Sequence, residues 1–387
     1  MKIPWTYNLR SLKVRRVTTG MTILAIGLVV AVFVSLLALA EGHERTFSST
    51  GLEGNAVILG QGALAEAMSF IPRDEVKIIR TLASIAREES GETLASAELL
   101  IQVFVPRRTG TLAMVLFRGV TPVSYEVHRE VRLVEGRWPR PGTEELVVGS
   151  TASKRLDGVE LGQDLPMGKS RWKIVGRFDA GGATYDSEVW CPLEALRADT
   201  RRDQISVVHL RLKPDVQVSQ LRAQAEGDPR LHLTVRSEKV HFEEQSRQVW
   251  ILRSMALFIA SLMAIGAGFA AMNTMYGTIA YRSREIATLR AIGFTPRSIL
   301  ASFILESTFM AIPGGVIGCC LPFPFVHGKT GGTMNIHNLA EIAFEIRITP
   351  SILLLAMGFA VLIGIVGGYL PARAASRLSI VESLREA

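Results

Sequence analysis

The sequence predicts a membrane α-helical protein with four transmembrane helices and an α+β domain outside the membrane. The 387-residue chain is 48% hydrophobic and 20% charged, with a mean hydropathy of +0.26. This composition is too apolar for an ordinary soluble enzyme, and it excludes a disordered chain. Four windows lack charge, or nearly so, over roughly the 20 residues that a helix needs to cross a bilayer. Residues of about 42–250, between the first two windows, suffice for a folded domain.

The four windows are residues 17–40, 254–281, 298–326 and 348–372, and the third contains one acid, Glu306. At 1.5 Å per residue, each window can cross the hydrocarbon core with some tilt. The first window has an alternative interpretation as a cleaved secretory signal, because Ala38-Leu39-Ala40 resembles a cleavage site. A signal core is only about 7–15 residues long, so the length of the window favours an uncleaved anchor.

The distribution of Lys and Arg predicts the orientation of the chain. The N-terminal segment, the segment 282–297 and the C-terminal tail together carry 12 bases and 3 acids, whereas the remainder carries 31 bases and 33 acids. Cytoplasmic segments next to spans are enriched in bases, so both termini are predicted inside and residues of about 42–250 outside. This asymmetry accounts for the net charge of +7 without a nucleic-acid partner.

Strand and helix patterns alternate along the outer segment. Strands are predicted at 55–59, 205–212 and 231–235, helices at 72–84 and 216–225, and a hairpin from 99–105 and 112–120. Short apolar runs among glycines and prolines predict a β-rich insert at about 121–204. Strand–helix–strand units flank the insert on both sides, which predicts a ferredoxin-like or porter-type subdomain with the β-rich subdomain inserted in it. Residues 237–253 are predicted to form a stalk helix continuous with the second span.

The motifs of catalysis and of metal binding are missing. Gly168-Lys169-Ser170 resembles the end of a phosphate-binding loop, but residue 163 is Gln where that motif requires Gly. Neither a hydrolase elbow nor an HExxH or paired-cysteine ligand set occurs. His128, His209 and His241 lie far apart in the sequence, and such histidines are usually packing or surface residues. The chain is therefore predicted to be non-catalytic, with no catalytic, cofactor-binding or metal-binding residues.

The segment from Tyr281 to Arg297 is the most informative part of the sequence. Ile286, Leu289 and Ile292 recur at helical spacing with charged residues on the other faces, and Gly293 is a plausible helix stop. Such a short amphipathic helix can lie on lipid headgroups or dock into a groove on a cytoplasmic partner. The pattern alone does not separate these two possibilities.

The string R-x-R-E-I-x-T-L-R-A-I-G, from Arg282 to Gly293, resembles the loop of MacB/FtsX-like permeases of ABC transporters. Further segments along the chain are similar to the same family. They are Arg15-Arg16 with Thr22–Gly27, Val147–Ser150, Val175-Gly176, Pro192-Leu193, Leu305-Glu306 with Gly314–Gly318, Gly368–Ala375 and Val381–Arg385. The resemblance covers effectively the whole chain, and the four-span order with one large loop agrees with it independently.

The resemblance implies a permease subunit in a bacterial inner membrane, with the following segments. They are residues 1–41 (cytoplasmic N-terminus and first transmembrane helix), 42–236 (periplasmic core domain), 237–281 (stalk and second transmembrane helix), 282–297 (cytoplasmic coupling helix), 298–326 (third transmembrane helix), 327–347 (periplasmic loop), 348–372 (fourth transmembrane helix) and 373–387 (cytoplasmic tail).

The resemblance also implies how the chain works and with which partners. A separate cytoplasmic ABC ATPase, carrying ATP and Mg²⁺, would drive movements of the periplasmic domain that export a substrate, with a periplasmic adaptor. The permease would pair with a second copy of itself or a paralogous permease, surrounded by membrane lipid. The residues carried over as the ATPase-coupling helix are Arg282, Arg284, Glu285, Leu289, Arg290 and Gly293.

Small residues and one acid within the spans have expected roles of their own. Glycines at close spacing allow helices to approach each other, and the expected packing positions are Gly266, Gly268, Gly314, Gly318, Gly364 and Gly368. Glu306 lies about 13 Å along the helix from Arg297. It is expected to reach the inner interface or to pair with a neighbouring chain, and an ion pathway is the alternative.

Other functions fit parts of the same sequence. Within the family, the alternatives are a lipoprotein-releasing permease and a regulator of a periplasmic cell-wall hydrolase. Outside it, the chain could be a membrane receptor with a ligand-binding ectodomain, although its inner segments are too short for a signalling module. A membrane-anchored hydrolase is disfavoured because no nucleophile constellation is present.

Overall fold

The computed structural model describes residues 16–335 and 338–377, which form two compact units. Residues up to Glu41, Trp250–Lys329 and the segment from Ile346 form the helical unit. Gly42–Val249 and Thr330–Glu345 form the α/β unit. The predicted N-terminal residues before Arg16 and the tail from residue 378 lie outside the described residues.

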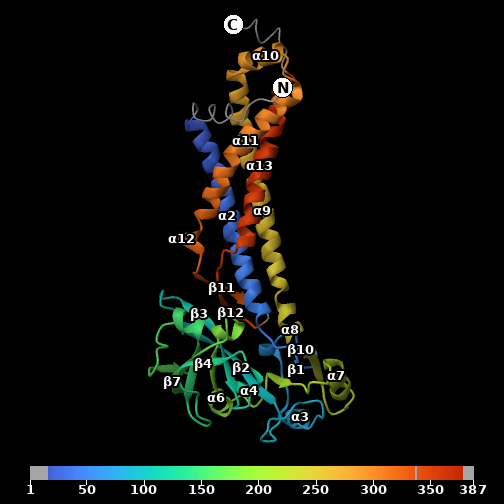
Figure 1. Ribbon diagram of the computed structural model, residues 1–387. Helices are drawn as coiled ribbons and strands as arrows, with labels where there is room; N and C mark the ends of the chain where they lie inside the picture. The colour runs from blue at the N-terminus through green and yellow to red at the C-terminus, as the bar shows by residue number, and fades with distance from the viewer. Residues whose placement is uncertain (1–15, 336–337, 378–387) are drawn as a thin grey trace. The chain divides into compact units, whose positions relative to one another are not determined.

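Within the described residues, four helices are long and apolar enough to cross a membrane, as predicted: α2 (Arg16–Ser48), α9 (Arg247–Tyr281), α11 (Pro296–Cys320) and α13 (Pro350–Ser376). Helices α11 and α13 each begin with a proline in the first turn. Proline has no N–H, but the N–H groups of the first turn have no partner within the helix, so no helical hydrogen bond is lost. Two short helices, α10 (Ser283–Ala291) and α12 (Phe323–Val326), complete the helical unit. Figure 1 draws α11 in orange beside α13 in red.

Two predicted segments are each divided into two helices. The predicted third span, 298–326, comprises α11, which ends at Cys320, and α12, which starts after Pro322, because proline cannot continue the hydrogen-bond ladder. The expected continuous stalk is divided at Ser246 into α8 (Glu238–Gln245) and α9. Ser246 Oγ donates to the Glu243 carbonyl at 2.6 Å, a local bond of the kind that competes with the helical ladder.

A mixed sheet of ten strands forms the α/β unit, and Figure 1 shows most of its strands in green and cyan. The strands are β1 (Asn55–Gly60), β2 (Ala95–Pro106), β3 (Leu112–Val120), β4 (Arg132–Gly136), β5 (Glu145–Gly149), β6 (Asp164–Met167), β7 (Ser170–Asp179), β8 (Val189–Pro192), β9 (Val207–Arg211) and β10 (Leu233–Ser237). Their order is β10-β1-β9-β2-β3-β8-β5-β7-β4, with β6 on β7. The pairs β3–β8 and β5–β7 are parallel, and the others are antiparallel.

Strand β2 belongs to both halves of the sheet. Its first residues, 95–98, pair with β9, and its remaining residues, 99–106, pair with β3 in the predicted hairpin. The β-rich segment was expected as a separate inserted subdomain, but β8 pairs with β3 and extends the same sheet. Residues of both halves share one buried core, which includes Ile58, Leu99, Phe117 and Trp172.

Short helices connect the strands and cover the sheet. They are η1 (Glu66–Met68), α3 (Arg73–Ile79), α4 (Ser124–Val127), α5 (Ser150–Arg155), η2 (Thr184–Ser187), α6 (Leu193–Thr200) and α7 (Val218–Glu226), besides α8. Helices α3 and α7 each connect two strands, as the periodicity predicts. Helix α3 ends at Ile79, however, five residues before its predicted end.

The segment predicted as an outer loop, 327–347, contains a β-hairpin of β11 (Thr330–Asn335) and β12 (Ala340–Glu345). The hairpin belongs to the α/β unit although it lies between α12 and α13 in the sequence. Glu341 forms ion pairs with Arg107 and Arg155, and Ser187 Oγ donates to the Ala343 carbonyl at 3.1 Å. These contacts explain why the segment does not remain an open loop.

Candidate functional site

Helix α10 is fixed at its start by Arg282, which is 8% exposed. The Nε of Arg282 donates to Glu285 Oε2 at 2.9 Å, and its Nη1 donates to Glu306 Oε2 on α11 at 3.2 Å. Its guanidinium also lies over the Phe303 ring, with 5.7 Å between Cζ and the ring centroid, which is within the range of a cation–π contact. Glu306 therefore pairs with Arg282 of its own chain at the start of α10, while its expected pairing with a neighbouring chain stays a prediction.

The end of α10 is a Schellman motif. Phe294 N–H bonds the Leu289 carbonyl at 3.1 Å, and Gly293 N–H bonds the Arg290 carbonyl at 3.1 Å. Gly293 has φ +106°, a conformation that a residue with a side chain rarely adopts, so glycine is required at this position. Arg290 Nη1 donates to the Ser376 carbonyl at the end of α13 at 2.6 Å, which ties α10 to a second helix.

The two faces of α10 differ in exposure. Ile286 and Ala287 are buried against the helical unit, and Leu289 is half-buried. Arg284, Thr288 and Ile292 recur every four residues and are exposed, with 65% of Ile292 open to solvent. The buried face of α10 thus packs on the helical unit. Its other face presents an exposed stripe of one cation, one hydroxyl and one apolar side chain.

The predicted packing glycines fall into two groups. A Cβ added at Gly314, Gly318, Gly364 or Gly368 would lie within 3.0 Å of an atom of a neighbouring helix. Gly314 and Gly318 face Ile23, Gly27 and Val30 of α2, while Gly364 and Gly368 face Ala311 and Ser307 of α11. A Cβ at Gly266 or Gly268 would meet no atom of the described chain within 4 Å.

A buried charge cluster lies in the α/β unit, and the sequence did not predict it. Its members, all buried, are Glu66, Glu98, Arg118, His128, Glu188, His209, Glu238 and His241. Arg118 on β3 donates to Glu188 through Nε at 2.7 Å and Nη2 at 2.8 Å, to Glu98 at 2.7 Å and to Glu66 at 3.0 Å. Burial lowers the pKa of Arg118, but the three carboxylates outweigh burial and raise this pKa well above its usual value.

The three imidazoles of the cluster contact its carboxylates. His128 Nε2 lies 2.8 Å from Glu98 Oε1, His209 Nδ1 lies 3.0 Å from Glu238 Oε1, and His241 Nε2 lies 3.4 Å from Glu66 Oε1. Burial lowers the pKa of His209, but Glu98, Glu66 and Glu238 together raise it to about 10. The Leu52 N–H also donates to Glu238 Oε2 at 3.0 Å.

Sequence reasoning treated these histidines as unrelated because they are far apart in the chain. The strand register brings them together: Ser96 of β2 pairs with His209 of β9, and Glu98 lies two residues further on the same face. His128 follows α4 and enters from a third element. No sequence spacing encodes this meeting, although glutamates within apolar strand patterns, as at Glu98, were a usable signal.

A small cavity borders the buried charge cluster at Arg118 and Glu188. It is also lined by Leu116, Phe242 and the β12 residues Ala340 and Ile342. Its volume of about 20 Å³ accommodates roughly one water molecule. It is too small to hold an organic substrate.

These features define a class of protein: a membrane protein with four candidate spans, a large α/β domain after the first, and an exposed helix between the second and third. Residues 19–227, more than half of the chain, match the MacB-like periplasmic core domain. Residues 257–380 match the FtsX-like permease C-terminal family. The chain therefore belongs to the MacB/FtsX-like permeases of ABC transporters, as the sequence motifs indicated.

Several named proteins are similar over 97% of this chain. The macrolide export ATP-binding/permease protein MacB of Bdellovibrio bacteriovorus is 24% identical, and that of Escherichia coli is 25% identical. The pyoverdine export ATP-binding/permease protein PvdT of Pseudomonas entomophila is 26% identical. The aligned region is 60%, 59% and 58% of these three relatives, so the chain spans about 60% of their length.

Among solved structures, the periplasmic region of MacB from Actinobacillus actinomycetemcomitans aligns with 50% of this chain and 92% of its own. The TM-score is 0.37 and the sequence identity is 10%.

Proposed function

We propose that this chain is the permease subunit through which a separate cytoplasmic ABC ATPase drives export of a substrate. It would reside in a bacterial inner membrane with both termini cytoplasmic and its α/β unit in the periplasm. ATP and Mg²⁺ would be bound by the ATPase, and this chain would carry out no chemical step. Family membership supports the permease role, and the charge asymmetry of the sequence supports the orientation.

The geometry of α10 carries the proposal. A helix that only covers lipid headgroups would point its apolar residues toward the membrane, with no need for rigid attachment at both ends. Arg282 fixes the start of α10 to α11, and Arg290 fixes its last turn to α13. A force applied to the exposed stripe of Arg284, Thr288 and Ile292 would thus be transmitted to two of the long helices.

Other exposed surfaces of the chain suit the remaining predicted partners. The exposed apolar side chains of α9, among them Phe258 and Phe269 at 65% and 64%, suit lipid or a second permease chain. A periplasmic adaptor would contact the α/β unit. Relatives named for macrolide and pyoverdine export favour efflux over lipoprotein release or control of a cell-wall hydrolase.

The experiment compares charge reversals inside and outside the exposed stripe. We expect Arg284→Glu to reduce co-purification of the ATPase at least about tenfold, the effect of losing roughly 1.4 kcal/mol of interface energy. Stimulation of ATP hydrolysis should fall in parallel. Arg171→Glu, an exposed arginine on β7, is the matched control and should leave both unchanged.

Normal association and stimulation with both Arg284→Glu and Ile292→Asp would refute the assignment of α10 as the ATPase contact. Purification of the full chain with no ATPase, even after crosslinking in intact cells, would instead contradict the transporter proposal itself and favour the receptor alternative.

A further inference from the structure

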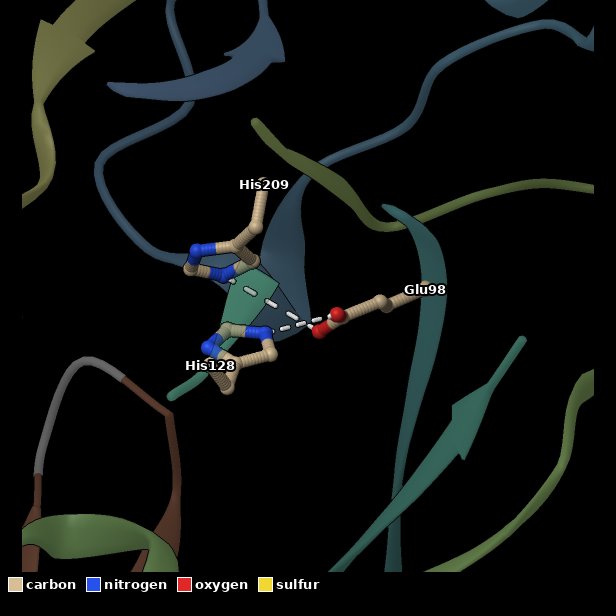
Figure 2. Close-up of side chains that lie close together, drawn as sticks. All are labelled: Glu98, His128 and His209. Atoms are coloured by element: carbon tan, nitrogen blue, oxygen red, sulfur yellow. Dashed lines mark hydrogen bonds and ion pairs between the residues drawn. The ribbon is translucent and has the colours of Figure 1, made fainter. Parts of the chain in front are cut away.

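We propose that the buried charge cluster of the α/β unit binds one divalent transition-metal ion, with Zn²⁺ as its best representative. The ligands would be Glu98, the Nε2 atom of His128 and the Nε2 atom of His209. Figure 2 shows these three side chains directed toward one another from separate segments. This site is independent of the proposed transport function.

The donor atoms lie near the spacing that an ion between them requires. One ligand atom from each of the three residues lies within 4.8 Å of the others. His128 Nε2 is 2.8 Å from Glu98 Oε1, and His209 Nε2 is 4.0 Å from Glu98 Oε2. Ligands at about 2.0–2.2 Å from Zn²⁺ lie about 3.3–3.5 Å apart in tetrahedral geometry, so small side-chain movements would complete the site.

His209 is oriented as metal-binding histidines are. Its Nδ1 contacts Glu238 Oε1 at 3.0 Å, and Glu238 is itself held by the Leu52 N–H at 3.0 Å. A carboxylate behind the imidazole fixes the tautomer that presents Nε2 as a ligand. The His209 side chain is fully buried, and its Nε2 makes no hydrogen bond within the described part of the chain but faces Glu66 Oε1 at 3.5 Å and Glu98 Oε2 at 4.0 Å. The nitrogen thus faces two carboxylates, an arrangement that a cation bound between them would stabilise.

The charge of the cluster calls for a cation. Glu66, Glu98, Glu188 and Glu238 supply four negative charges, and Arg118 supplies one positive charge. The carboxylates exceed the guanidinium by three negative charges, and burying such an excess is costly in a dry interior. A divalent ion would offset two of these charges.

A second group of potential ligands borders the first. His128 Nδ1, Glu130 and Glu238 also lie within 4.8 Å of one another. Neither Glu130 oxygen nor His128 Nδ1 makes a hydrogen bond within the described residues. We place the ion at Glu98, His128 and His209 because all three are fully buried and His209 is already oriented, and we assign Glu130 to the outer shell.

Bound there, the ion would connect β2, β9 and the segment after α4. It would act as a structural brace, since the complete burial of its ligands leaves no room for a substrate. Two imidazoles and one carboxylate favour zinc-like ions over Ca²⁺ or Mg²⁺, which prefer oxygen ligands.

The test uses the full chain in detergent, purified with a tag that contains no histidine and treated with a chelator. We expect uptake of one Zn²⁺ per chain by elemental analysis after dialysis, and a rise in the unfolding temperature. His209→Asn and His128→Asn should each weaken binding at least about 100-fold, and Glu238→Gln about 10–100-fold. His232→Asn, at an exposed histidine outside the cluster, is the matched control and should bind like the wild type.

Co²⁺ provides a readout that does not depend on variants that fold. In the wild-type chain, Co²⁺ should give the visible absorption of a four-coordinate nitrogen and oxygen site, and Zn²⁺ should remove it. No metal uptake by the wild-type chain would overturn the proposal and leave a cluster neutralised by protons. Equal uptake by a folded variant with both His128→Asn and His209→Asn would also overturn it, because the metal would lie elsewhere.

Discussion

At the scale of single residues, Arg118 and Arg137 show how burial changes the value of an ion pair. Both donate to carboxylates at about the same distance, 2.7 Å to Glu188 and 2.7 Å to Glu145. Arg118 is 1% exposed, whereas the Arg137 side chain is 43% exposed. Water can replace the guanidinium at the surface, but nothing replaces it in the interior, where its removal leaves three carboxylates uncompensated.

We therefore expect Arg118→Met to destabilise the α/β unit by about 3–5 kcal/mol, the typical cost of breaking a buried charge pair. Arg137→Met, the surface control, should change the free energy of unfolding little. Denaturant unfolding of the full chain followed by tryptophan fluorescence measures this, since Trp190 Nε1 donates to Glu188 at 2.9 Å and lies within the network. Equal effects of the two substitutions would contradict the assigned role of burial.

At the scale of secondary-structure elements, glycine allows α2 and α11 to pack closely. A Cβ on Gly318 would lie 2.5 Å from Val30 Cβ and 2.6 Å from the Gly27 carbonyl oxygen. A Cβ on Gly266 in α9 would meet no atom of the described residues within 4 Å. Both glycines lie in equally apolar surroundings, so the sequence alone could not tell the contact position from the open one.

This contrast predicts opposite effects on stability when glycine is replaced by alanine at the two positions. Gly318→Ala should destabilise the helical unit by about 1–3 kcal/mol, because backbone atoms must move apart to accept the methyl group. Gly266→Ala should be neutral or stabilising by up to about 1 kcal/mol, because alanine favours the helix. The fraction of chain that stays monodisperse in detergent after heating checks both. A heat-stable Gly318→Ala variant would show that α2 and α11 are not packed at this position.

Several secondary-structure elements could be predicted from local sequence patterns, whereas other features could not. The periodicity of apolar residues predicted β1, the β2–β3 hairpin and α7, because each pattern reflects contacts of its own element. The buried charge cluster escaped prediction because His128, His209 and Glu98 meet only through strand register. The role of Gly293 was visible, since a glycine after an amphipathic helix is a local signal.

At the scale of the whole molecule, the hairpin β11–β12 completes the α/β unit from a distant part of the sequence. Glu341 on β12 forms ion pairs with Arg107 at the end of β2 and with Arg155 at the end of α5. Burial raises the pKa of Glu341, but Arg155 and Arg107 outweigh burial and lower it below 4.5. The sequence missed this hairpin because its strands are short and adjoin an apolar span.

The attachment of the hairpin should depend on pH. A carboxyl group with a lowered pKa stabilises the folded state above its unfolded pKa of about 4.5, and this stabilisation is lost as the pH falls through the folded pKa. At pH 7 we expect amide hydrogens of residues 340–345 to exchange about tenfold or more faster in Glu341→Gln than in the wild type, since bonds to charged groups contribute about 1.5–3 kcal/mol.

After correction for intrinsic exchange rates, this difference between the two proteins should shrink as the pH falls below 4.5 and through the lowered pKa of Glu341. A pH-independent difference would mean that the amide substitution acts through packing and not through the charge of Glu341.

The place of the hairpin in the sequence also has a consequence for how the protein is made. Residues 42–249 leave the ribosome first, and Thr330 follows about 80 residues later, after α9, α10 and α11. At about 5–20 residues per second, the interval is on the order of 4–16 s. The contacts that β12 makes with β3 and η2 therefore cannot form until that interval has passed.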